Sequence, residues 1–402
     1  MEYELPEGWK WCRLGEVADW GSGGTPSRKN PEYYNGSIPW IKTGELNESY
    51  IFDSEEKISE EAINHSSAKL FPKETVVLAM YGATIGKTAI FGIDASTNQA
   101  CACAICHKDL DNHYLFNFLK SKKDYFIYNA KGGAQPNISQ EIIKDTVIPL
   151  PPTLAEQQRI VNRIETMFAK LDEAKEKAQN VVDSFETRKA AILHKAFTGE
   201  LTANWRKENG VADESWKEKR FDEVADIKSN LVDVAEYQDF PHIAPDNIEK
   251  KTGVLLEYHT VAEDKVKSGK HRFYAGQILY SKIRPYLSKV VVVDFDGVCS
   301  ADMYPIEAKG DTRFLWYQML SNEFLDRASN SGSRSVLPKI NQKELSVIPM
   351  RTCSLPEQQE IVHILDTVLE KETRAKEAAQ TVLDQIALLK KSILARAFRG
   401  EL

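Results

Sequence analysis

The chain has 402 residues, of which 42% are hydrophobic and 28% charged, and its formal net charge is −7. This length predicts two or three domains at roughly 150 residues each. No stretch reaches the roughly 18 apolar residues of a membrane span, and the acidic N-terminus is not that of a signal peptide, so we expect a cytoplasmic protein. Because binding to phosphates requires Lys and Arg, DNA binding by this acidic chain would need a local basic cluster or a partner.

Residues 1–150 alternate between strand and helix signals. Strands are predicted at 74–80, 87–93 and 99–105, where apolar and β-branched residues dominate. An amphipathic helix is predicted over 111–130, and a glycine-rich loop at 131–137 precedes a short helix. These signals predict an α+β domain with long polar loops, which is where recognition residues are usually found.

The segment Met80–Gly92 contains Gly-Lys-Thr and superficially resembles a phosphate-binding loop. Such a loop requires two glycines five positions apart, so that backbone N–H groups surround the phosphate. Here Gly82 and Gly86 are four apart, and Tyr81 stands where the first glycine should be. We therefore expect no nucleotide site at this segment.

A cysteine cluster follows, made of Cys101, Cys103 and Cys106 with His107 directly behind it. A metal site is conceivable, but zinc sites usually have paired Cys-x2-Cys units with a second pair downstream. The alternation of Cys101 and Cys103 favours one face of a half-buried strand, and free cysteine is a common small core residue. No metal site is predicted.

A long helix is predicted from about residue 153, after a proline-rich stretch, to the position before Gly199. Its apolar residues alternate in steps of four and three, which is typical of a heptad repeat, and Arg188 interrupts them. The predicted packed positions are Ile160, Ile164, Met167, Leu171, Ala174, Ala178, Val181, Phe185 and Ile192.

The second half of the chain repeats the first. "AEQQRIV" at 155–161 returns as "PEQQEIV" at 356–362, and "AFTGEL" at 196–201 returns as "AFRGEL" at 397–402. The chain is therefore a duplicated unit of about 200 residues, which suggests pseudo-two-fold symmetry. We predict four parts: an α+β domain at 1–150, a helical region at 151–206, a second α+β domain at 207–350 and a second helical region at 351–402.

The second helical region repeats the apolar spacing, with Glu372 out of pattern. Its predicted packed positions are Ile361, Leu365, Val368, Ala375, Ala379, Val382, Ile386, Leu389 and Ile393. Each helix would be on the order of 60 Å long at 1.5 Å per residue. Because the domain between the helices returns the chain, we expect an antiparallel coiled coil that separates the two domains by a fixed distance. A role limited to dimerisation or stiffening is the alternative.

The duplicated loops differ in sequence. "GATIGK" at 82–87 aligns with "RPYLSK" at 284–289, so that both glycines are lost and only the lysine persists. Arg284 could donate to guanine O6 and N7, and Lys87 or Lys289 could contact a phosphate. In a second loop Gly132 faces Arg334 and Asn137 faces Lys339. The pattern suits two half-targets, although any single difference can be ordinary surface variation.

These motifs together resemble the specificity subunits of type I restriction–modification systems. The resemblance rests on "LPPTLAEQQRIV" with "AFTGEL", on "LPEQQEIV" with "AFRGEL", and on "GSGGTPSR", "IPWIKTGEL" and "YGATIGK" in the first domain. It implies two target-recognition domains, each reading one half of a bipartite DNA site. It also implies that the two helices set the spacer and dock two modification subunits, which bind S-adenosylmethionine and methylate adenine, and through them the restriction subunits. By this resemblance the chain itself is not catalytic and binds no cofactor.

The residue-level expectations have two groups. The candidate DNA-binding residues are Lys42, Thr43, Tyr81, Thr84, Lys87, Lys131, Gln135, Asn137, Lys282, Arg284, Tyr286, Lys289, Arg334 and Lys339. The candidate helix-packing or partner-binding residues are Ile160, Ile164, Leu171, Ala174, Ala178, Phe185, Leu365, Val368, Ala375, Ala379, Ile386 and Leu389. A coiled-coil scaffold without DNA specificity is the rival function. A metal or redox enzyme is disfavoured because Cys101 and Cys103 align with Asp302 and Tyr304 in the second copy.

Overall fold

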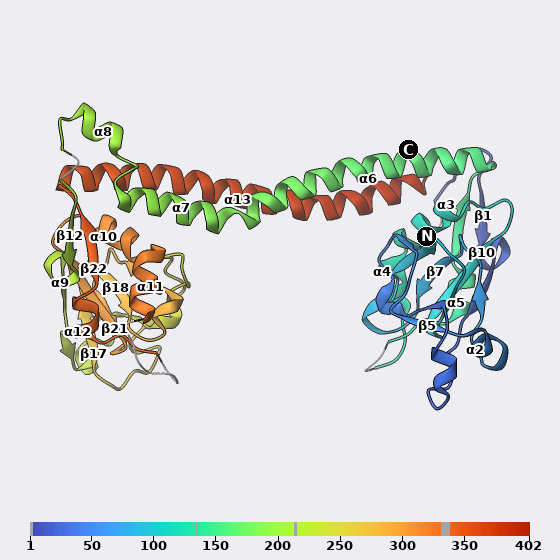
Figure 1. Ribbon diagram of the computed structural model, residues 1–402, viewed down its shortest axis with the longest axis horizontal. Helices are drawn as coiled ribbons and strands as arrows, with labels where there is room; N and C mark the ends of the chain where they lie inside the picture. The colour runs from blue at the N-terminus through green and yellow to red at the C-terminus, as the bar shows by residue number, and fades with distance from the viewer. Residues whose placement is uncertain (1–2, 134–135, 213–214, 331–337) are drawn as a thin grey trace. The chain divides into compact units, whose positions relative to one another are not determined.

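The computed structural model describes residues 3–133, 136–212, 215–330 and 338–402. The chain divides into two compact units: unit 1 contains residues 1–178 and 381–402, and unit 2 contains residues 179–380. Helix α6 (Leu154–Asp183) and helix α13 (Leu355–Ala397) each contribute residues to both units (Figure 1). No helix among the described residues has the length and apolar character needed to cross a membrane.

The described residues of unit 1 form three sheets. The largest is ordered β2 (Ala18–Ser22), β10 (Cys101–Cys106), β7 (Val76–Ala79), β8 (Thr88–Phe91) and β4 (Tyr50–Ile51). The second is ordered β5 (Glu56–Ile58), β3 (Ile38–Ile41), β9 (Ala95–Thr97) and β6 (Leu70–Phe71). The third pairs β1 (Lys10–Arg13) with β11 (Val147–Leu150). The predicted strands correspond to β7, β8 and β10.

The short helices of unit 1 are α1 (Leu14–Val17), α2 (Glu60–His65), α3 (Asn112–Ser121), α4 (Lys123–Asn129) and α5 (Gln140–Asp145). Four of them, α1, α3, α4 and α5, contribute to the core on one face of the main sheet, whereas α2 packs with β3 and β5. The predicted helix over 111–130 is thus confirmed as two consecutive helices. Ala102 and Ala104 of β10 belong to the core beneath α3, whereas Cys101 and Cys103 belong to a second core on the opposite face. The expectation of a half-buried strand was therefore wrong, because both faces of β10 are covered.

Unit 2 has the same kinds of sheet. One is ordered β13 (Ala225–Ile227), β21 (Met303–Ala308), β18 (Ile278–Ser281) and β19 (Val290–Val292). Another is ordered β14 (Leu231–Val232), β17 (Lys270–Phe273), β20 (Gly297–Cys299), β15 (Pro241–Ile243) and β16 (His259–Thr260). The two-stranded sheet pairs β12 (Lys217–Arg220) with β22 (Pro349–Thr352).

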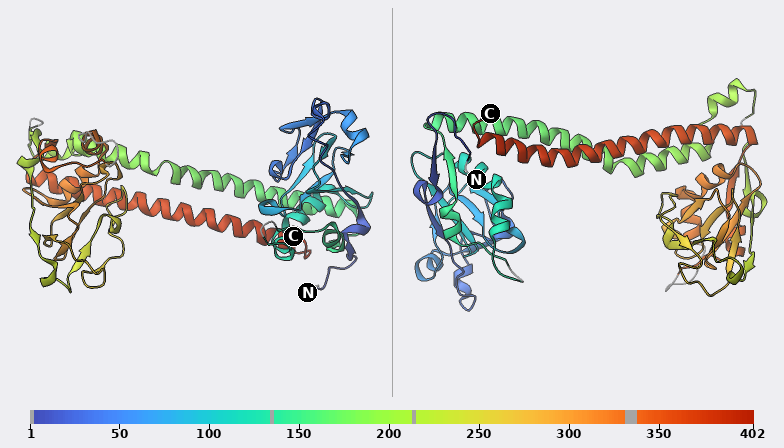
Figure 2. Two further views of the ribbon diagram at one scale, coloured as in Figure 1. Left: turned by 90° about the horizontal axis from the view of Figure 1, so that it is seen from below. Right: turned by 180° about the vertical axis from the view of Figure 1, so that it is seen from behind.

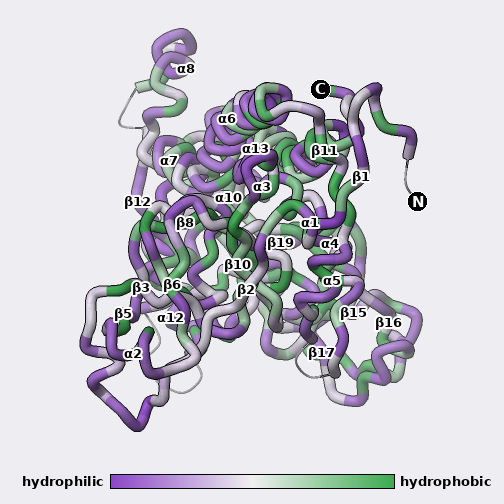
Figure 3. The backbone as a smooth tube through the Cα atoms, turned by 90° about the vertical axis from the view of Figure 1, so that its right-hand side faces the viewer, coloured by the Kyte–Doolittle hydropathy of each residue, from purple (hydrophilic) through white to green (hydrophobic). Residues whose placement is uncertain are grey.

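The helices of unit 2 are α7 (Phe185–Thr198), α8 (Ala203–Glu208), α9 (Phe221–Val224), α10 (Thr312–Met319), α11 (Asn322–Asn330) and α12 (Gln342–Ser346). Helix α8 is mostly hydrophilic (Figure 3), yet it buries one charged side chain, Arg206. Only Ser184 separates α6 from α7, so the predicted first helix is present as two segments. The Ser184 hydroxyl donates to the carbonyl of Asn180 in the preceding turn, a contact that often bends helices.

In unit 1, the start of α6 packs against the end of α13. Ile160 and Ile164 share a core with Leu394, Ala397 and Phe398. Lys390 forms an ion pair with Asp172, and Arg159 donates to the backbone carbonyl of Leu402 at 2.7 Å. The start of α6 and the C-terminal segment therefore run antiparallel in unit 1.

In unit 2, α7 packs antiparallel against the start of α13. Leu193 and Phe197 share a core with Ile361 and Leu365. Arg188 and Glu372, the two residues that interrupted the apolar patterns, form an ion pair with 2.7 Å between Nε and Oε2. The two polar residues are thus partners (Figure 2 shows these helices from two further sides).

Part of the expected packed face of α13 was wrong. Ala375, Val382 and Leu389 are exposed, Leu389 by 48%. The inward-facing positions are instead Leu365, Glu372, Ala379, Ile386 and Leu394. The first three spacings between these positions are seven residues and the last is eight. The change is expected because an α-helix of 3.6 residues per turn drifts away from a strict heptad repeat.

Candidate nucleic-acid interface

Three of the candidate residues in unit 1, Tyr81, Thr84 and Lys87, lie on the loop between β7 and β8. The loop contains a short 3-10 helix at Gly82–Thr84, closed by a hydrogen bond from Ile85 N–H to the Gly82 carbonyl at 3.2 Å. Gly82 and Gly86 have φ values of 63° and 81°, which glycine adopts without a steric cost. The glycines therefore shape a turn, and the loop differs from a phosphate-binding loop as its spacing predicted.

The second candidate loop of unit 1 is joined to the first by backbone hydrogen bonds. Gly82 N–H donates to the Pro136 carbonyl at 2.8 Å, and Ile138 N–H donates to the Met80 carbonyl at 3.0 Å. Asn137 forms β-bridges with both Tyr81 and Lys131. The candidates Lys131 and Asn137 are thus brought next to Tyr81, while Gln135 lies outside the described residues.

Lys42 and Thr43 reach the same region through a different sheet. They follow Ile41 at the end of β3, and the carbonyl of Ile41 accepts a hydrogen bond from Asn98 N–H at 3.2 Å. Two residues later, the carbonyl of Ala100 accepts from Met80 N–H. The Lys42 ammonium lies 3.1 Å from Glu56 and 3.2 Å from Glu55, and these hydrogen bonds raise the pKa of Lys42 above its ordinary value.

The loop at 282–289 in unit 2 shares several backbone hydrogen bonds with the loop of unit 1. Leu287 N–H donates to the Arg284 carbonyl at 2.8 Å, as Ile85 does to Gly82 in unit 1. Arg284 and Ser288 have φ values of 49° and 46°, at the positions that glycines occupy in unit 1. Left-handed backbone costs a residue with a side chain about 1–2 kcal/mol. The loop of unit 2 therefore has an unfavourable backbone at two residues, one of which is Arg284.

The second loop of unit 2 is attached as in unit 1. Arg284 N–H donates to the Pro338 carbonyl at 2.8 Å, and Ile340 N–H donates to the Lys282 carbonyl at 2.9 Å. Lys339 forms a β-bridge with Ile283, which places it beside the loop that carries Arg284 and the exposed Tyr286. Arg334 lies outside the described residues.

The shared hydrogen bonds correct the alignment of the two copies. Lys282 N–H donates to the Asp302 carbonyl as Met80 N–H donates to that of Ala100, so equivalent positions here differ by 202. Cys101 pairs with Ala79, and its equivalent Met303 pairs with Ser281. The expected equivalence of Cys101 with Asp302, and of Cys103 with Tyr304, was therefore wrong by one residue. The repeated "EQQ" motif fixes an offset of 201 in the helices, which does not hold within the sheets.

This register shows a residue that the sequence interpretation missed. The Asp302 carboxylate lies 3.2 Å from the Lys339 ammonium and 3.8 Å from that of Lys282. Lys282 also donates to the Ala301 carbonyl at 2.6 Å. One carboxylate thus lies between two candidate DNA-binding lysines, and its equivalent in unit 1 is Ala100, so the repeat gave no signal for it.

The two loop pairs differ in how their lysines are partnered. In unit 2, Lys289 donates to the Pro245 carbonyl at 2.7 Å and lies 3.4 Å from Asp246. In unit 1, the ammonium groups of Lys87 and Lys131 form neither a hydrogen bond nor an ion pair with any described residue. Lys87 and Lys131 are therefore available to phosphates without first breaking an ion pair.

Two of the cysteines of β10, Cys101 and Cys103, lie in the core. Cys101 and Cys103 are buried, and burial raises the pKa of the Cys103 thiol to about 12. A thiol must ionise to bind a metal or to attack a substrate. No cluster of three potential metal ligands occurs in the described part of the chain.

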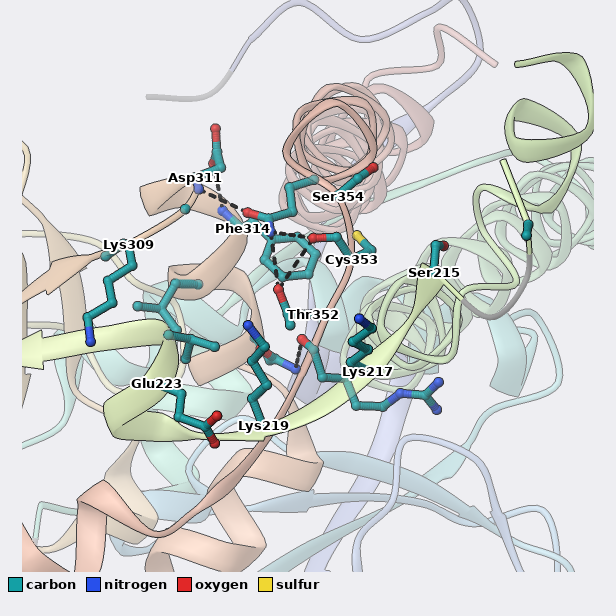
Figure 4. Close-up of a pocket in the computed structure, with 18 residues that line it drawn as sticks. Ser215, Lys217, Lys219, Glu223, Lys309, Asp311, Phe314, Thr352, Cys353 and Ser354 are labelled. Atoms are coloured by element: carbon teal, nitrogen blue, oxygen red, sulfur yellow. Dashed lines mark hydrogen bonds between the residues drawn. The ribbon is translucent and has the colours of Figure 1, made fainter. Parts of the chain in front are cut away.

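A cavity of about 630 Å³ lies in unit 2, away from these loops and beside the N-terminus of α13. Lys217, Lys219 and Lys309 line it together with Asp311 and the segment 352–354 (Figure 4). Its walls come from β12, β22 and the turn before α10, so it belongs to the base of the domain and not to the loops at 282–289 and 338–340.

Comparison with known proteins shows the family to which the chain belongs. The family model described as type I restriction modification DNA specificity domain matches the chain twice, at residues 6–183 and 213–383. The chain belongs to this family of type I specificity subunits. A specificity subunit is the DNA-recognition component of its system and not a catalytic one, and no comparison supports a scaffold without DNA specificity.

Individual relatives agree with this assignment. The specificity subunit is 35% identical to the EcoDI specificity subunit of Escherichia coli, over 99% of this chain and 90% of that protein. It is 33% identical to the EcoR124I/EcoR124II specificity subunit of Escherichia coli, over 39% of this chain and 40% of that protein.

Two solved structures share the fold. One is a chain described under complex assembly and conformational transition of the type I R-M system, with a TM-score of 0.76, 19% identity and full coverage of both chains. The other is the HsdS subunit from Thermoanaerobacter tengcongensis, with a TM-score of 0.67, 19% identity and coverage of 100% of this chain and 99% of that chain. At this identity the likeness is one of fold.

Proposed function

We propose that the two loop pairs of this specificity subunit recognise the two halves of a bipartite DNA target. The observation that carries the proposal is a turn that occurs in both units, is attached to the second loop by equivalent hydrogen bonds, and carries different side chains. Gly82 and Arg284 have left-handed backbone at equivalent positions, yet only unit 2 has a side chain there. A strained non-glycine residue that persists in a surface loop points to a functional requirement.

Arg284 is the residue in unit 2 with the chemistry for base recognition. Its guanidinium can donate two hydrogen bonds to guanine O6 and N7 in the major groove. The lysines of both units would contact phosphates, which position the protein without reading sequence. In unit 2, Lys282 and Lys339 would leave the Asp302 carboxylate and contact a DNA phosphate instead.

The long helices would set the distance between the two halves of the target. The contacts within each unit support an antiparallel coiled coil, since Asp172 meets Lys390 in unit 1 and Arg188 meets Glu372 in unit 2. Two modification subunits would dock on these helices, bind S-adenosylmethionine and methylate adenine in the cytoplasm. Restriction subunits would join through the modification subunits.

Methylation mapping tests the proposal directly. The chain would be expressed with its neighbouring modification subunit in a methylation-deficient host, and the genomic DNA would be sequenced by a single-molecule method that detects methyladenine. We expect one new motif in two parts with a fixed gap. Unmodified DNA from an assembled complex supplied with the cofactor would contradict the proposal.

The spacing role has its own test. Inserting one helical turn after Ala178, near the middle of the paired helices, should change the length of the gap and leave both half-sites unchanged. A motif with an altered half-site and the original gap would exclude the helices as the determinant of spacing.

A further inference from the structure

In each unit a buried glutamine joins the first turn of the long helix to the recognition domain. Gln157 in α6 and Gln358 in α13 are the first glutamines of the two "EQQ" repeats, and both are buried. The glutamines that follow, Gln158 and Gln359, are exposed. A duplicated buried amide between two structural parts is more than the heptad pattern requires.

In unit 1, both ends of the amide bind the recognition domain. Gln157 Oε1 accepts a hydrogen bond from the backbone N–H of Asp111 at 2.8 Å, and Nε2 donates to the carbonyl of Asp109 at 2.9 Å. Asp111 is the N-cap of α3, and its carboxylate accepts from the N–H of Tyr114. The amide thus fastens the start of α6 to the start of a core helix.

In unit 2, one of the two bonds is retained. Gln358 Oε1 accepts from the backbone N–H of Asp311 at 2.9 Å, and Asp311 is the N-cap of α10. Nε2 instead donates to Thr352 Oγ1 at 3.1 Å and to the Cys353 carbonyl at 2.9 Å, in the segment that leads into α13. Figure 4 shows these bonds as dashed lines near the labelled Asp311, Thr352 and Cys353.

We propose that Gln157 and Gln358 are positioning residues that fix the direction of each long helix relative to its recognition domain, and so restrict the spacer length that the protein accepts. This inference rests on the proposed function. Helix α6 has 30 residues and is therefore about 45 Å long at 1.5 Å per residue. A rotation of about 5° at its first turn would move the far end by about 4 Å. That distance is close to the rise of one base pair, about 3.4 Å.

A primary amide is well suited to this position because it accepts and donates at once. A glutamate has nearly the same shape, can still accept from the N–H of Asp111, and cannot donate to the Asp109 carbonyl. Gln157→Glu should therefore loosen the attachment of α6 without removing side-chain volume.

The experiment uses the complete complex of specificity and modification subunits. Methylation rates would be measured on duplexes that contain both half-sites separated by the native spacer, or by one base pair more or less. For Gln157→Glu we expect the rate on the altered spacers, relative to the native spacer, to rise at least tenfold. The letters of both half-sites should not change. Gln158→Glu places the same change one residue along, on an exposed side chain, and should behave as the wild type.

Unit 2 supplies an independent variant that leaves the glutamine in place. A Cβ added at Gly310 would lie 2.6 Å from Gln358 Oε1, so Gly310→Ala should displace the amide. We expect Gly310→Ala to relax spacer selectivity more than Gln358→Glu, because the added Cβ displaces the oxygen that accepts from Asp311, whereas the glutamate keeps that acceptor. The change from Gln358→Glu should be smaller than that from Gln157→Glu, because its lost donor bonds lead back to its own segment.

A further control separates position from stability. Ile160→Val, which trims the core beside Gln157, should lower the melting temperature while leaving the ratio of rates between spacers unchanged. The inference is overturned if Gln157→Glu lowers all rates in the same proportion, or if Ile160→Val relaxes the ratio equally. If the wild-type complex methylates no bipartite site, the proposed function itself fails, which is a distinct outcome.

Discussion

The turn at Gly82 in unit 1 and the turn at Arg284 in unit 2 are attached to their second loops by equivalent hydrogen bonds and have different side chains. They differ most in residue type and in the partners of their lysines. Duplication has thus preserved the support that holds each loop, while the groups available to DNA have changed. A scaffold that is retained while its loops vary is a general route to new specificity.

The long helices show a second contrast. Glu156 and Glu357 are equivalent residues of the "EQQ" repeats, yet Glu156 pairs with Arg159 at the surface, whereas Glu357 is fully buried. Glu357 accepts hydrogen bonds from Arg206 at 2.7 Å and from Trp216 Nε1 at 2.9 Å. Of these two equivalent carboxylates, that of Glu156 is solvated and that of Glu357 is part of the core.

The largest expected effect comes from removing the partner of the buried carboxylate. Arg206→Met should lower the free energy of unfolding of unit 2 by about 3–5 kcal/mol, because Glu357 would remain buried without its countercharge. The matched change Arg159→Met in unit 1 should cost at most about 1 kcal/mol, since that ion pair is exposed. Denaturant unfolding of the two variants measures both values. Equal losses would show that the two glutamates are equivalent after all.

A pH dependence follows from the same residue. Burial alone would raise the pKa of Glu357, but hydrogen bonds from Thr202, Arg206 and Trp216 outweigh it and hold the pKa below the ordinary 4.5. A lowered pKa in the folded state contributes stability above pH 4.5, and this contribution is lost as the pH falls further. Stability curves from pH 6 to pH 3 should therefore fall less steeply below pH 4.5 in Glu357→Gln. An unchanged slope would mean that Glu357 does not contribute to acid unfolding.

Arg284→Gly should separate recognition from stability. Loss of a bidentate contact with guanine should weaken methylation dependent on the second half-site by about 1–3 kcal/mol in transition-state free energy. The glycine should also relieve left-handed strain and stabilise unit 2 by about 1 kcal/mol. Methylation of single-base variants of each half-site, together with thermal melting, measures the two effects. A change confined to the first half-site would show that the loop is assigned to the wrong half.

The smallest expected effect concerns the lysines. Replacing Lys87 by Gln should reduce the slope of log affinity against log salt by about 1, as for a lost phosphate contact. The same change at Lys289 should reduce it less, because Lys289 is held by Pro245 and Asp246. Binding titrations of the complete complex at several salt concentrations give both slopes. A larger change for Lys289 would reverse the comparison between the two loops.

Most of the local structure could be predicted from the sequence. The strands β7, β8 and β10 and the long helices follow from apolar content and periodicity, which report local burial. The sequence named Tyr81, Asn137, Arg284 and Lys339 as candidates, but only the β-bridges show that the two loops of each unit lie together. The faces of β10 and the exposure of Leu389 were not predictable, because burial depends on elements far away in the sequence.

By itself, the sequence determined the duplication, the type of most elements and the family, since these depend on repeated motifs and on the spacing of apolar residues. Only the tertiary structure showed that Arg188 and Glu372, which disturb two separate patterns, are partners across 184 residues. It also decided that Glu357 is buried while Glu156 is not, and that Asp302 lies between two lysines. These outcomes depend on contacts between distant segments, whose electrostatic and hydrogen-bond energies leave no periodic signal in the chain.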